Sequence, residues 1–214
     1  MPVKVFQSSG QGNMATIVQG INYAAQNGAT VINMSFGTYA RSLALEDALA
    51  NAYATAVLVA AAGNDGLCIG PNRCPDLQYG IPSFPGALSF VLGVETRPLP
   101  PQGFTNYDID GPVMSAYSDL LNYELRAPGT QIVSTIPNGG YRLYSGTSMA
   151  APLISGAASL YKIIRPNESQ ELMWGNLIET LSSYFQLMDA IEVVPVPKLW
   201  ISSYSVNDTL SGDG

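Results

Sequence analysis

The amino-acid sequence predicts an α/β fold in which a mostly parallel central sheet is covered by helices on both faces. Strand-like and helix-like segments alternate over the first 62 residues, which is typical of parallel strands joined by right-handed crossovers. Residues 56–62 (AVLVAAA) are apolar at nearly every position, as expected of a strand that is buried on both faces. A chain of 214 residues is long enough to bury one sizeable hydrophobic core.

Four further elements are predicted before that buried strand. Residues 3–6 form a short apolar run that indicates a core strand. Apolar residues recur at helical spacing over residues 14–27, which predicts an amphipathic helix that ends near an Asn-Gly pair. Residues 31–34 are a second strand-like run, and residues 43–52 carry a second helical apolar face.

The remainder of the chain is predicted to be richer in loops. Prolines punctuate residues 63–145, in which residues 89–94 are predicted as a strand and residues 99–124 as surface loops. Residues 148–164 predict a helix with small residues on one side. A second helix is expected after Asn167, which would be its cap, and is expected to end near residue 182.

A boundary is predicted near the end of the chain. The segment Val-Pro-Val-Pro at residues 194–197 has the composition of a linker, and β-like sequence begins at residue 199. We therefore expect one domain over residues 1–192, followed over residues 193–214 by a linker and the start of a further β-like segment.

Composition argues against several classes of protein. The formal net charge is −7 and there is no basic run, so nucleic acid or an anionic membrane surface is not an expected partner. No apolar run approaches the ~18 residues that a spanning helix needs. The first residues have neither the charged region nor the apolar region of a signal peptide.

The two cysteines, Cys68 and Cys74, lie in one loop rich in glycine, proline and asparagine. Two thiols this close can form a small disulfide in an oxidising compartment, and the alternative is two unpaired thiols in a cytosolic protein. A zinc site is not expected, because two cysteines without histidine supply only half of a zinc shell.

The most informative segment is residues 146–152 (GTSMAAP), which is found in a chain that contains no histidine. Ser148 lies where the predicted helix begins, and the N–H groups and dipole at a helix start favour negative charge. These donors can stabilise the oxyanion that forms when a serine hydroxyl attacks a carbonyl. On spacing alone, an ordinary helix cap is the commoner interpretation of such a serine.

Three blocks in order resemble the subtilisin-like (subtilase) serine peptidases. Residues 31–37 (VINMSFG) resemble the strand of that family that pairs with substrate, and residues 60–66 (AAAGNDG) resemble its oxyanion-asparagine strand and turn. Residues 127–129 (APG) and 145–152 (SGTSMAAP) resemble the approach to the nucleophile. The resemblance covers roughly residues 1–192 and implies a subtilisin-like fold.

The resemblance implies roles for individual residues. Ser148 is the implied nucleophile, and the side chain of Asn64 is the implied oxyanion donor, with the backbone N–H of Ser148 as the second donor. Without its surrounding block, Asn64 would be interpreted as a turn residue. The implied substrate-binding residues are Ser35, Phe36, Gly37, Ala62 and Gly63 in the S1 walls, and Gly10, Gln11 and Gly12 in an edge strand that pairs with substrate. Either glycine-containing segment could instead be plain loop.

The chain departs from the family in one decisive respect. The family's triad order is Asp, His, Ser, and its Asp and His blocks precede the segment that residues 3–6 resemble; neither block is present. We therefore expect the C-terminal portion of a subtilase catalytic domain, with the N-terminal part of that domain missing. The implied activity is endopeptidase hydrolysis through an acyl-enzyme in the full-length parent, and the chain alone is expected to be inactive. The alternative is a non-catalytic pseudo-protease module that binds peptides.

The resemblance also implies partners and a location. The implied partners are a polypeptide substrate and the upstream remainder of the catalytic domain. A secreted or cell-envelope location is implied, and it favours the disulfide between Cys68 and Cys74. No cofactor is expected; structural calcium is possible by family, but the sequence shows no ligand set for it.

Overall fold

The computed structural model describes residues 1–69, 80–96, 103–108, 123–169 and 172–181. Its elements in chain order are α1 (Met14–Gln26), β1 (Val31–Met34), α2 (Leu43–Tyr53), β2 (Val57–Ala61), β3 (Cys68–Ile69), β4 (Leu92–Thr96), β5 (Tyr107–Asp108), β6 (Leu125–Ala127), β7 (Ile132–Thr135), β8 (Tyr141–Tyr144) and α3 (Thr147–Ile164). A further helix covers residues 172–181.

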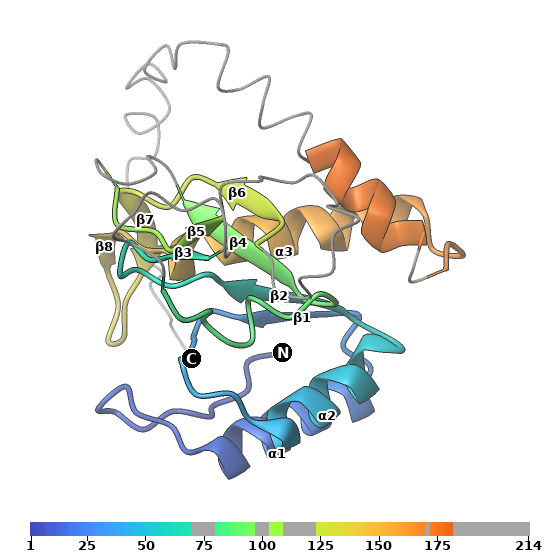
Figure 1. Ribbon diagram of the computed structural model, residues 1–214, viewed down its shortest axis with the longest axis horizontal. Helices are drawn as coiled ribbons and strands as arrows, with labels where there is room; N and C mark the ends of the chain where they lie inside the picture. Colours follow the sequence, from blue (N-terminus) through green and yellow to red (C-terminus); the bar gives the residue numbers. More distant parts are fainter. Residues whose placement is uncertain (70–79, 97–102, 109–122, 170–171, 182–214) are drawn as a thin grey trace, which may run out of the picture.

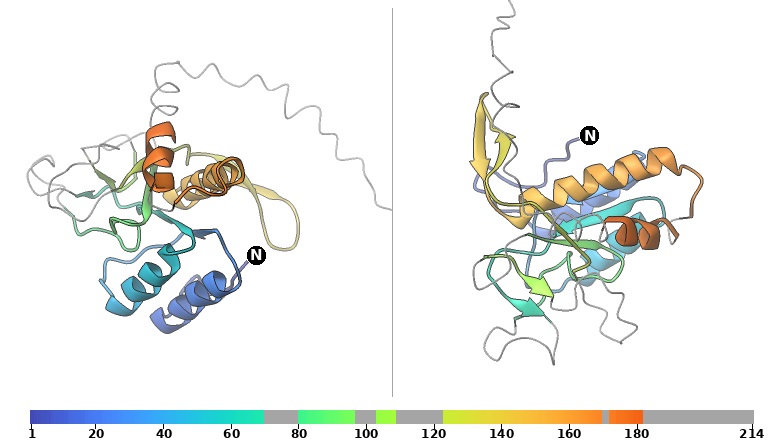
Figure 2. Two further views of the ribbon diagram at one scale, coloured as in Figure 1. Left: turned by 90° about the vertical axis from the view of Figure 1, so that its right-hand side faces the viewer. Right: turned by 90° about the horizontal axis from the view of Figure 1, so that it is seen from above.

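The central sheet has four parallel strands in the order β1-β2-β4-β6. Helices α1 and α2 cover one face of this sheet, and α3 crosses the other face (Figures 1 and 2). Two smaller sheets accompany it, a parallel pair β3-β5 and an antiparallel hairpin β7-β8. The predicted α/β fold with helices on both faces of a parallel sheet is therefore confirmed.

Strand β2 lies at the centre of the core and is buried along its whole length. Successive side chains of a strand point to opposite faces, so Leu58 and Ala60 pack with α1 and α2, whereas Val57 and Val59 pack with α3. The apolar character of residues 56–62 is explained by this double burial.

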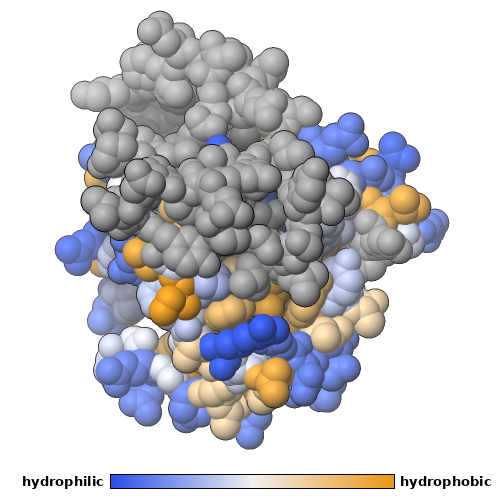
Figure 3. Space-filling model, in the orientation of Figure 1, coloured by the Kyte–Doolittle hydropathy of each residue, from blue (hydrophilic) through white to orange (hydrophobic). Residues whose placement is uncertain are grey.

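The two N-terminal helices begin and end where the sequence predicts. The Asn13 side chain accepts a hydrogen bond from Thr16 N at 2.8 Å and starts α1, and the Ser42 side chain accepts from Leu45 N at 3.4 Å and starts α2. Gly28 follows α1 with a φ of +78°, which is a conformation that favours glycine. On the face shown in Figure 3, hydrophilic residues alternate with hydrophobic ones over these helices, as expected of their outer surface.

The prediction of a core strand at residues 3–6 was wrong. These residues form no ladder with any described strand, although Val3, Val5 and Phe6 pack against the core beside α1. A strand needs a hydrogen-bonded neighbour, and a cavity of about 610 Å³ separates this segment from β1. Apolar character is therefore retained at residues 3–6 without strand pairing.

Two other boundaries differ from the predictions. The strand predicted at residues 89–94 is β4, which starts at Leu92 because turns occupy the residues before it; for example, Val91 N donates to Leu88 O at 2.8 Å. The last helix is described from residue 172; Leu172 N donates to the Ser169 side chain at 3.4 Å, and Met173 N donates to Ser169 O at 2.9 Å. Ser169, rather than the predicted Asn167, therefore caps it.

The segment predicted as surface loops is largely buried where it is described, with Gly103 and Phe104 half-buried. Thr105, Asn106, Tyr107, Tyr123 and Glu124 are all at most 5% exposed. Their side chains lie between β4, β6 and the loop after β2 and make buried hydrogen bonds, which weak periodicity in the sequence could not indicate.

The β7-β8 hairpin was not predicted. Its turn contains Asn138, Gly139 and Gly140, all with positive φ. Asn-Gly flanked by apolar residues is a strong hairpin signal, so the sequence did contain the information. The predicted linker and β-like segment at residues 193–214 lie outside the described residues.

Candidate active site

The candidate site lies at the carboxyl edge of the parallel sheet. Ser35 follows β1 directly, Asn64 follows β2, and Ser148 is the second residue of α3. Because β1 and β2 are parallel neighbours, their carboxyl ends lie at the same edge, which is where α/β sheets commonly hold their ligands. The start of α3 reaches the same edge and brings Ser148 to the other two residues.

Ser148 is joined to the end of β1 by two reciprocal hydrogen bonds. Ser148 Oγ donates to the Ser35 carbonyl at 3.0 Å, and Ser35 Oγ donates to the Ser148 carbonyl at 2.9 Å. Asn33 Nδ2 donates to Ser35 Oγ at 2.9 Å, and Ser155 Oγ donates to Asn33 Oδ1 at 3.0 Å. This chain of bonds fixes the predicted nucleophile against the sheet.

The oxygen that accepts from the Ser148 hydroxyl is a backbone carbonyl. A carbonyl cannot take the proton that a serine must lose to become a strong nucleophile. The sequence contains no histidine that could do so. The described residues therefore hold Ser148 in place without activating it.

The carboxamide of Asn64 is oriented by Thr147. Its Oδ1 accepts from Thr147 N at 2.8 Å and from Thr147 Oγ1 at 3.1 Å, and Thr147 Oγ1 accepts in turn from Gly63 N at 3.1 Å. Asn64 Nδ2 has no hydrogen-bond partner among the described residues, and the carboxamide lies beside Gly146. An N–H donor that no described residue engages is thus placed next to the start of α3, where the Ser148 N–H has no acceptor within the helix.

The turn before α3 is held by the predicted Ala-Pro-Gly block. Gly146 N donates to Gly129 O at 2.7 Å, and a Cβ on Gly129 would lie 2.7 Å from the Gly146 carbonyl oxygen. Only glycine fits at residue 129, because the two backbones approach so closely. The block that the sequence placed near the nucleophile is therefore adjacent to it in space.

The residues predicted as S1 walls follow the adjacent strands β1 and β2. Gly37 is packed against Ser83, since an added Cβ would lie 2.4 Å from Ser83 Oγ. The ring of Phe36 lies 5.2 Å from that of Phe6, so this side chain also contributes to the core. Ala62 is fully buried and Gly63 is half-buried.

Gly10, Gln11 and Gly12 form a turn rather than an edge strand in this structure. Gln7 N donates to Gln11 O at 2.9 Å, and Gly10 N donates to Gln7 O at 3.0 Å. Within the described residues, none of the hydrogen bonds of this segment reaches Ser148 or Asn64. Substrate pairing by residues 10–12 therefore stays a prediction.

A polar cluster that the sequence did not predict borders the site. Tyr39 OH donates to Asp65 Oδ2 and accepts from Asn106 Nδ2, the latter at 2.9 Å. Partial burial, followed by the hydrogen bond to Asp65, raises the pKa of Tyr39 above its ordinary value. These residues are far apart in sequence and belong to no periodic pattern, so only the fold could bring them together.

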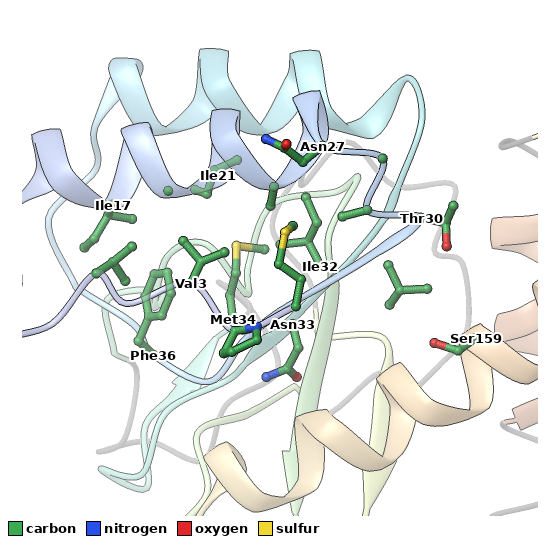
Figure 4. A pocket seen from close by; sticks show the side chains of 18 residues that line it. Val3, Ile17, Ile21, Asn27, Thr30, Ile32, Asn33, Met34, Phe36 and Ser159 are labelled. Atoms are coloured by element: carbon green, nitrogen blue, oxygen red, sulfur yellow. The ribbon is translucent and has the colours of Figure 1, made fainter.

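A cavity of about 610 Å³ lies between the N-terminal residues, α1 and β1. Figure 4 shows Val3, Ile17, Ile21, Ile32 and Met34 around it. It adjoins the edge of β1 that carries no described neighbouring strand.

The described residues contain no group of three His, Cys, Asp or Glu side chains that could hold a metal ion. None of the described helices combines the length and apolar character needed to cross a membrane. Cys68 is fully buried and disulfide-bonded, whereas Cys74 lies outside the described residues.

Comparison with known proteins identifies relatives over most of the chain. The model of the subtilase family matches residues 1–189. The chain is 34% identical over 182 residues to alkaline elastase YaB from Bacillus sp. (strain YaB), covering 85% of this chain and 42% of that protein. It is 35% identical over 182 residues to subtilisin DY from Bacillus licheniformis, covering 85% of this chain and 60% of that protein.

A third relative is named as an intracellular serine protease of Paenibacillus polymyxa. It is 37% identical over 162 residues, which are 75% of this chain and 44% of the relative. Among solved structures, sphericase matches with a TM-score of 0.67 and 30% identity, covering 82% of this chain and 58% of that one. The chain thus spans between 42% and 60% of the length of these relatives.

Proposed function

Because this chain belongs to the subtilase family, we propose that it supplies the nucleophile and the oxyanion hole of a serine endopeptidase. The observation that carries the proposal is the placement of Asn64 beside the start of α3. Thr147 holds Asn64 Oδ1 at 2.8 Å, so that the N–H groups of the carboxamide face away from this contact. A fixed donor next to a serine at a helix start is what an acyl-transfer reaction requires.

In the proposed reaction, Ser148 Oγ forms a bond to the carbonyl carbon of a bound peptide while its proton passes to a base. The carbonyl oxygen becomes an oxyanion that accepts hydrogen bonds from Asn64 Nδ2 and from Ser148 N. Collapse of this intermediate breaks the peptide bond, the base protonates the departing amine, and an ester on Ser148 remains. Water then hydrolyses the ester by the same steps and restores the serine.

The base in this proposal is a histidine from outside the 214 residues, since the chain contains none. Loss of the triad histidine in subtilisin, a member of the same family, lowers kcat by about 10⁶-fold. The chain alone therefore lacks useful peptidase activity, because its serine donates to a carbonyl rather than to a base.

The proposed partner is the upstream remainder of the same catalytic domain. The chain spans at most 60% of the relatives described above, and β1 has a described neighbour on one side only. An added strand would pair with the open edge of β1 and fill the cavity beside it, since both the edge and its apolar lining are accessible. The proposed substrate is a polypeptide, as in the family.

A secreted or cell-envelope location is also proposed. The disulfide at buried Cys68 supports it, because disulfides persist mainly in oxidising compartments. The Paenibacillus relative, by contrast, is named as an intracellular protease. Immunoblotting of culture medium, envelope and cytosol for the native protein distinguishes the two locations; detection only in cytosol would contradict the proposal.

The experiment that tests the enzymatic proposal uses the full-length protein with its upstream segment. Hydrolysis of casein and of a peptide anilide is expected, and Ser148→Ala is expected to abolish it. A full-length protein that binds peptides but hydrolyses none would favour the alternative, a non-catalytic peptide-binding module, for which the absence of histidine from this chain is the supporting observation.

A further inference from the structure

The loop that carries Asn64 has an unusual backbone. Asn64 stands between Gly63, with a φ of +106°, and Gly66, with a φ of +68°. Such conformations are readily adopted by glycine, and glycine also gives the chain the most freedom to leave them. The position of the Asn64 side chain therefore depends on contacts that hold residues 62–67 from outside.

Asn106 makes those contacts with all the hydrogen-bonding capacity of its side chain. Its Nδ2 donates to Ala62 O at 3.0 Å and to Tyr39 OH at 2.9 Å. Its Oδ1 accepts from Asp65 N at 3.0 Å and from Leu67 N at 3.1 Å. The carboxamide thus holds the loop on both sides of Asn64. It is fully buried, so water does not compete for these bonds.

The backbone around Asn106 binds the same loop. Asn106 N donates to Gly63 O at 2.9 Å, and Gly66 N donates to Phe104 O at 2.9 Å. A Cβ on Gly63 would lie 2.3 Å from Asn106 Nδ2, so the loop and the carboxamide are in direct contact. The loop cannot move without breaking several buried hydrogen bonds together.

Tyr39 connects Asn106 to the segment that follows β1. Its hydroxyl accepts a hydrogen bond from Asn106 Nδ2 and donates one to Asp65 Oδ2. Tyr39 lies two residues after Gly37. Asn106 therefore joins the segment after β1 to the segment after β2 at the edge where the candidate site lies.

We propose that Asn106 is a positioning residue that holds the oxyanion donor Asn64 in its reactive geometry. The inference rests on the proposed peptidase function, because Asn64 stabilises an oxyanion only in an acyl-transfer reaction. A displacement of about 1 Å in a positioned group can cost ~10²-fold in rate. Asn106 does not touch the reacting atoms and acts through the loop.

The test is a double-mutant cycle in the full-length protein with a peptide anilide as substrate. Asn106→Leu keeps the approximate size and removes all four side-chain hydrogen bonds. It is expected to lower kcat by ~10²-fold while KM changes little. In an Asn64→Leu background the same substitution is expected to lower kcat less than about threefold, because the donor that it misplaces is already absent.

Thr105→Val is the matched control. Thr105 is also fully buried, and the substitution removes the bonds from Thr96 N at 3.1 Å and to Asn106 O at 2.8 Å. It removes none of the four side-chain hydrogen bonds of Asn106 and none of the bonds to residues 62–67. It is expected to lower the melting temperature and to leave kcat nearly unchanged. Equal kcat losses for Asn106→Leu in both backgrounds would overturn the proposal, as would an unchanged kcat.

If Asn106→Leu does not fold, Asn106→Asp takes its place in the cycle. It keeps an oxygen for Asp65 N and Leu67 N but loses the donor to both Ala62 O and Tyr39 OH. It is expected to give a smaller loss of kcat that is again absent in the Asn64→Leu background. Equal losses in the two backgrounds would count against the proposal here too.

A measurement that does not depend on catalysis can test the positioning role of Asn106 separately from the proposed peptidase function. In ¹⁵N-labelled full-length protein, the Asn64 side-chain amide is expected to give one sharp signal pair that broadens or splits in the Asn106 variants but not in Thr105→Val. An inactive wild type with this broadening would refute the peptidase proposal and support the positioning role. Unchanged Asn64 signals in the Asn106 variants would overturn the positioning role whether or not the enzyme is active.

Discussion

Ser35 and Ser148 each donate a side-chain hydrogen bond to the other's carbonyl oxygen, at 2.9 and 3.0 Å. This pair joins the end of β1 to the first turn of α3 across 113 residues of sequence. The two bonds place the proposed nucleophile at the carboxyl edge of the sheet, and the hydroxyl must break one of them before it can transfer its proton to a base.

Removal of one bond of the pair is expected to affect stability more than chemistry. Ser35→Ala leaves the carbonyl that accepts from Ser148, but it removes the hydroxyl that donates to the Ser148 carbonyl and accepts from Asn33 Nδ2. We expect a loss of about 1 kcal/mol in the free energy of unfolding and a kcat within several-fold of wild type. Urea unfolding of the full-length protein, with exposed Ser134→Ala as control, measures the difference. Equal stabilities for the two variants would contradict this role.

Asn64→Leu tests the oxyanion donor. The substitution keeps the approximate size and removes the N–H groups, which act on the transition state rather than on bound substrate. In the full-length protein kcat is expected to fall about 10²–10³-fold, or ~2.7–4 kcal/mol, with KM little changed. Steady-state kinetics beside a thermal melt gives both quantities. A lower melting temperature with normal kcat would show that Asn64 is only a turn residue.

Gly63→Ala tests the contact between the Asn64 loop and Asn106. Gly63 and Gly28 both have positive φ, but an added Cβ meets Asn106 Nδ2 at 2.3 Å at residue 63 and nothing within 4 Å at residue 28. Gly28→Ala is therefore expected to cost only the conformational strain of about 1–2 kcal/mol. Gly63→Ala is expected to cost clearly more in denaturant unfolding. If the two variants lose the same stability, the close contact at Gly63 has no energetic consequence.

The sequence predicted elements that have a local signal, and it failed where an element depends on a partner distant in the chain. The strand at residues 56–62 was predictable because its apolar run reflects burial on two faces, and the helix at residues 14–27 because an amphipathic period and an Asn-Gly end are local signals. Residues 3–6 have the apolar run of a strand, but pairing requires a neighbour, which no local pattern reports.

The residues of the candidate site also differ in whether a local sequence signal indicates them. Ser148 and Asn64 could be selected as candidates because they lie within contiguous motifs, and the structure brings them to one edge of the sheet through the order of the strands. Thr147 orients the Asn64 carboxamide, and Asn106 bonds Tyr39 and the loop that carries Asn64, all through hydrogen bonds over long sequence separations. Such contacts depend on the completed fold and leave no periodicity in the sequence.

The predicted disulfide between Cys68 and Cys74 can be tested by mass. Cys68 is fully buried, so the protein should be unfolded in denaturant with an alkylating reagent, with and without prior reduction. We expect alkylation of both cysteines only after reduction. Two alkylated thiols in the denatured protein that was not reduced would contradict the disulfide and weaken the proposed extracytoplasmic location.

In the proposed mechanism, Ser148 becomes a nucleophile only when residues outside this chain supply a base. Covalent labelling with a fluorophosphonate tests it directly, because the reaction forms a bond from Ser148 Oγ to phosphorus, expels fluoride and needs a base for the hydroxyl proton. Mass spectrometry of the peptide that contains Ser148 reports the label. We expect labelling in the full-length protein, none in its Ser148→Ala variant, and none in the 214-residue chain alone. Labelling of Ser148 in the 214-residue chain at the full-length rate would contradict the account, and so would an unlabelled Ser148 in a folded full-length protein.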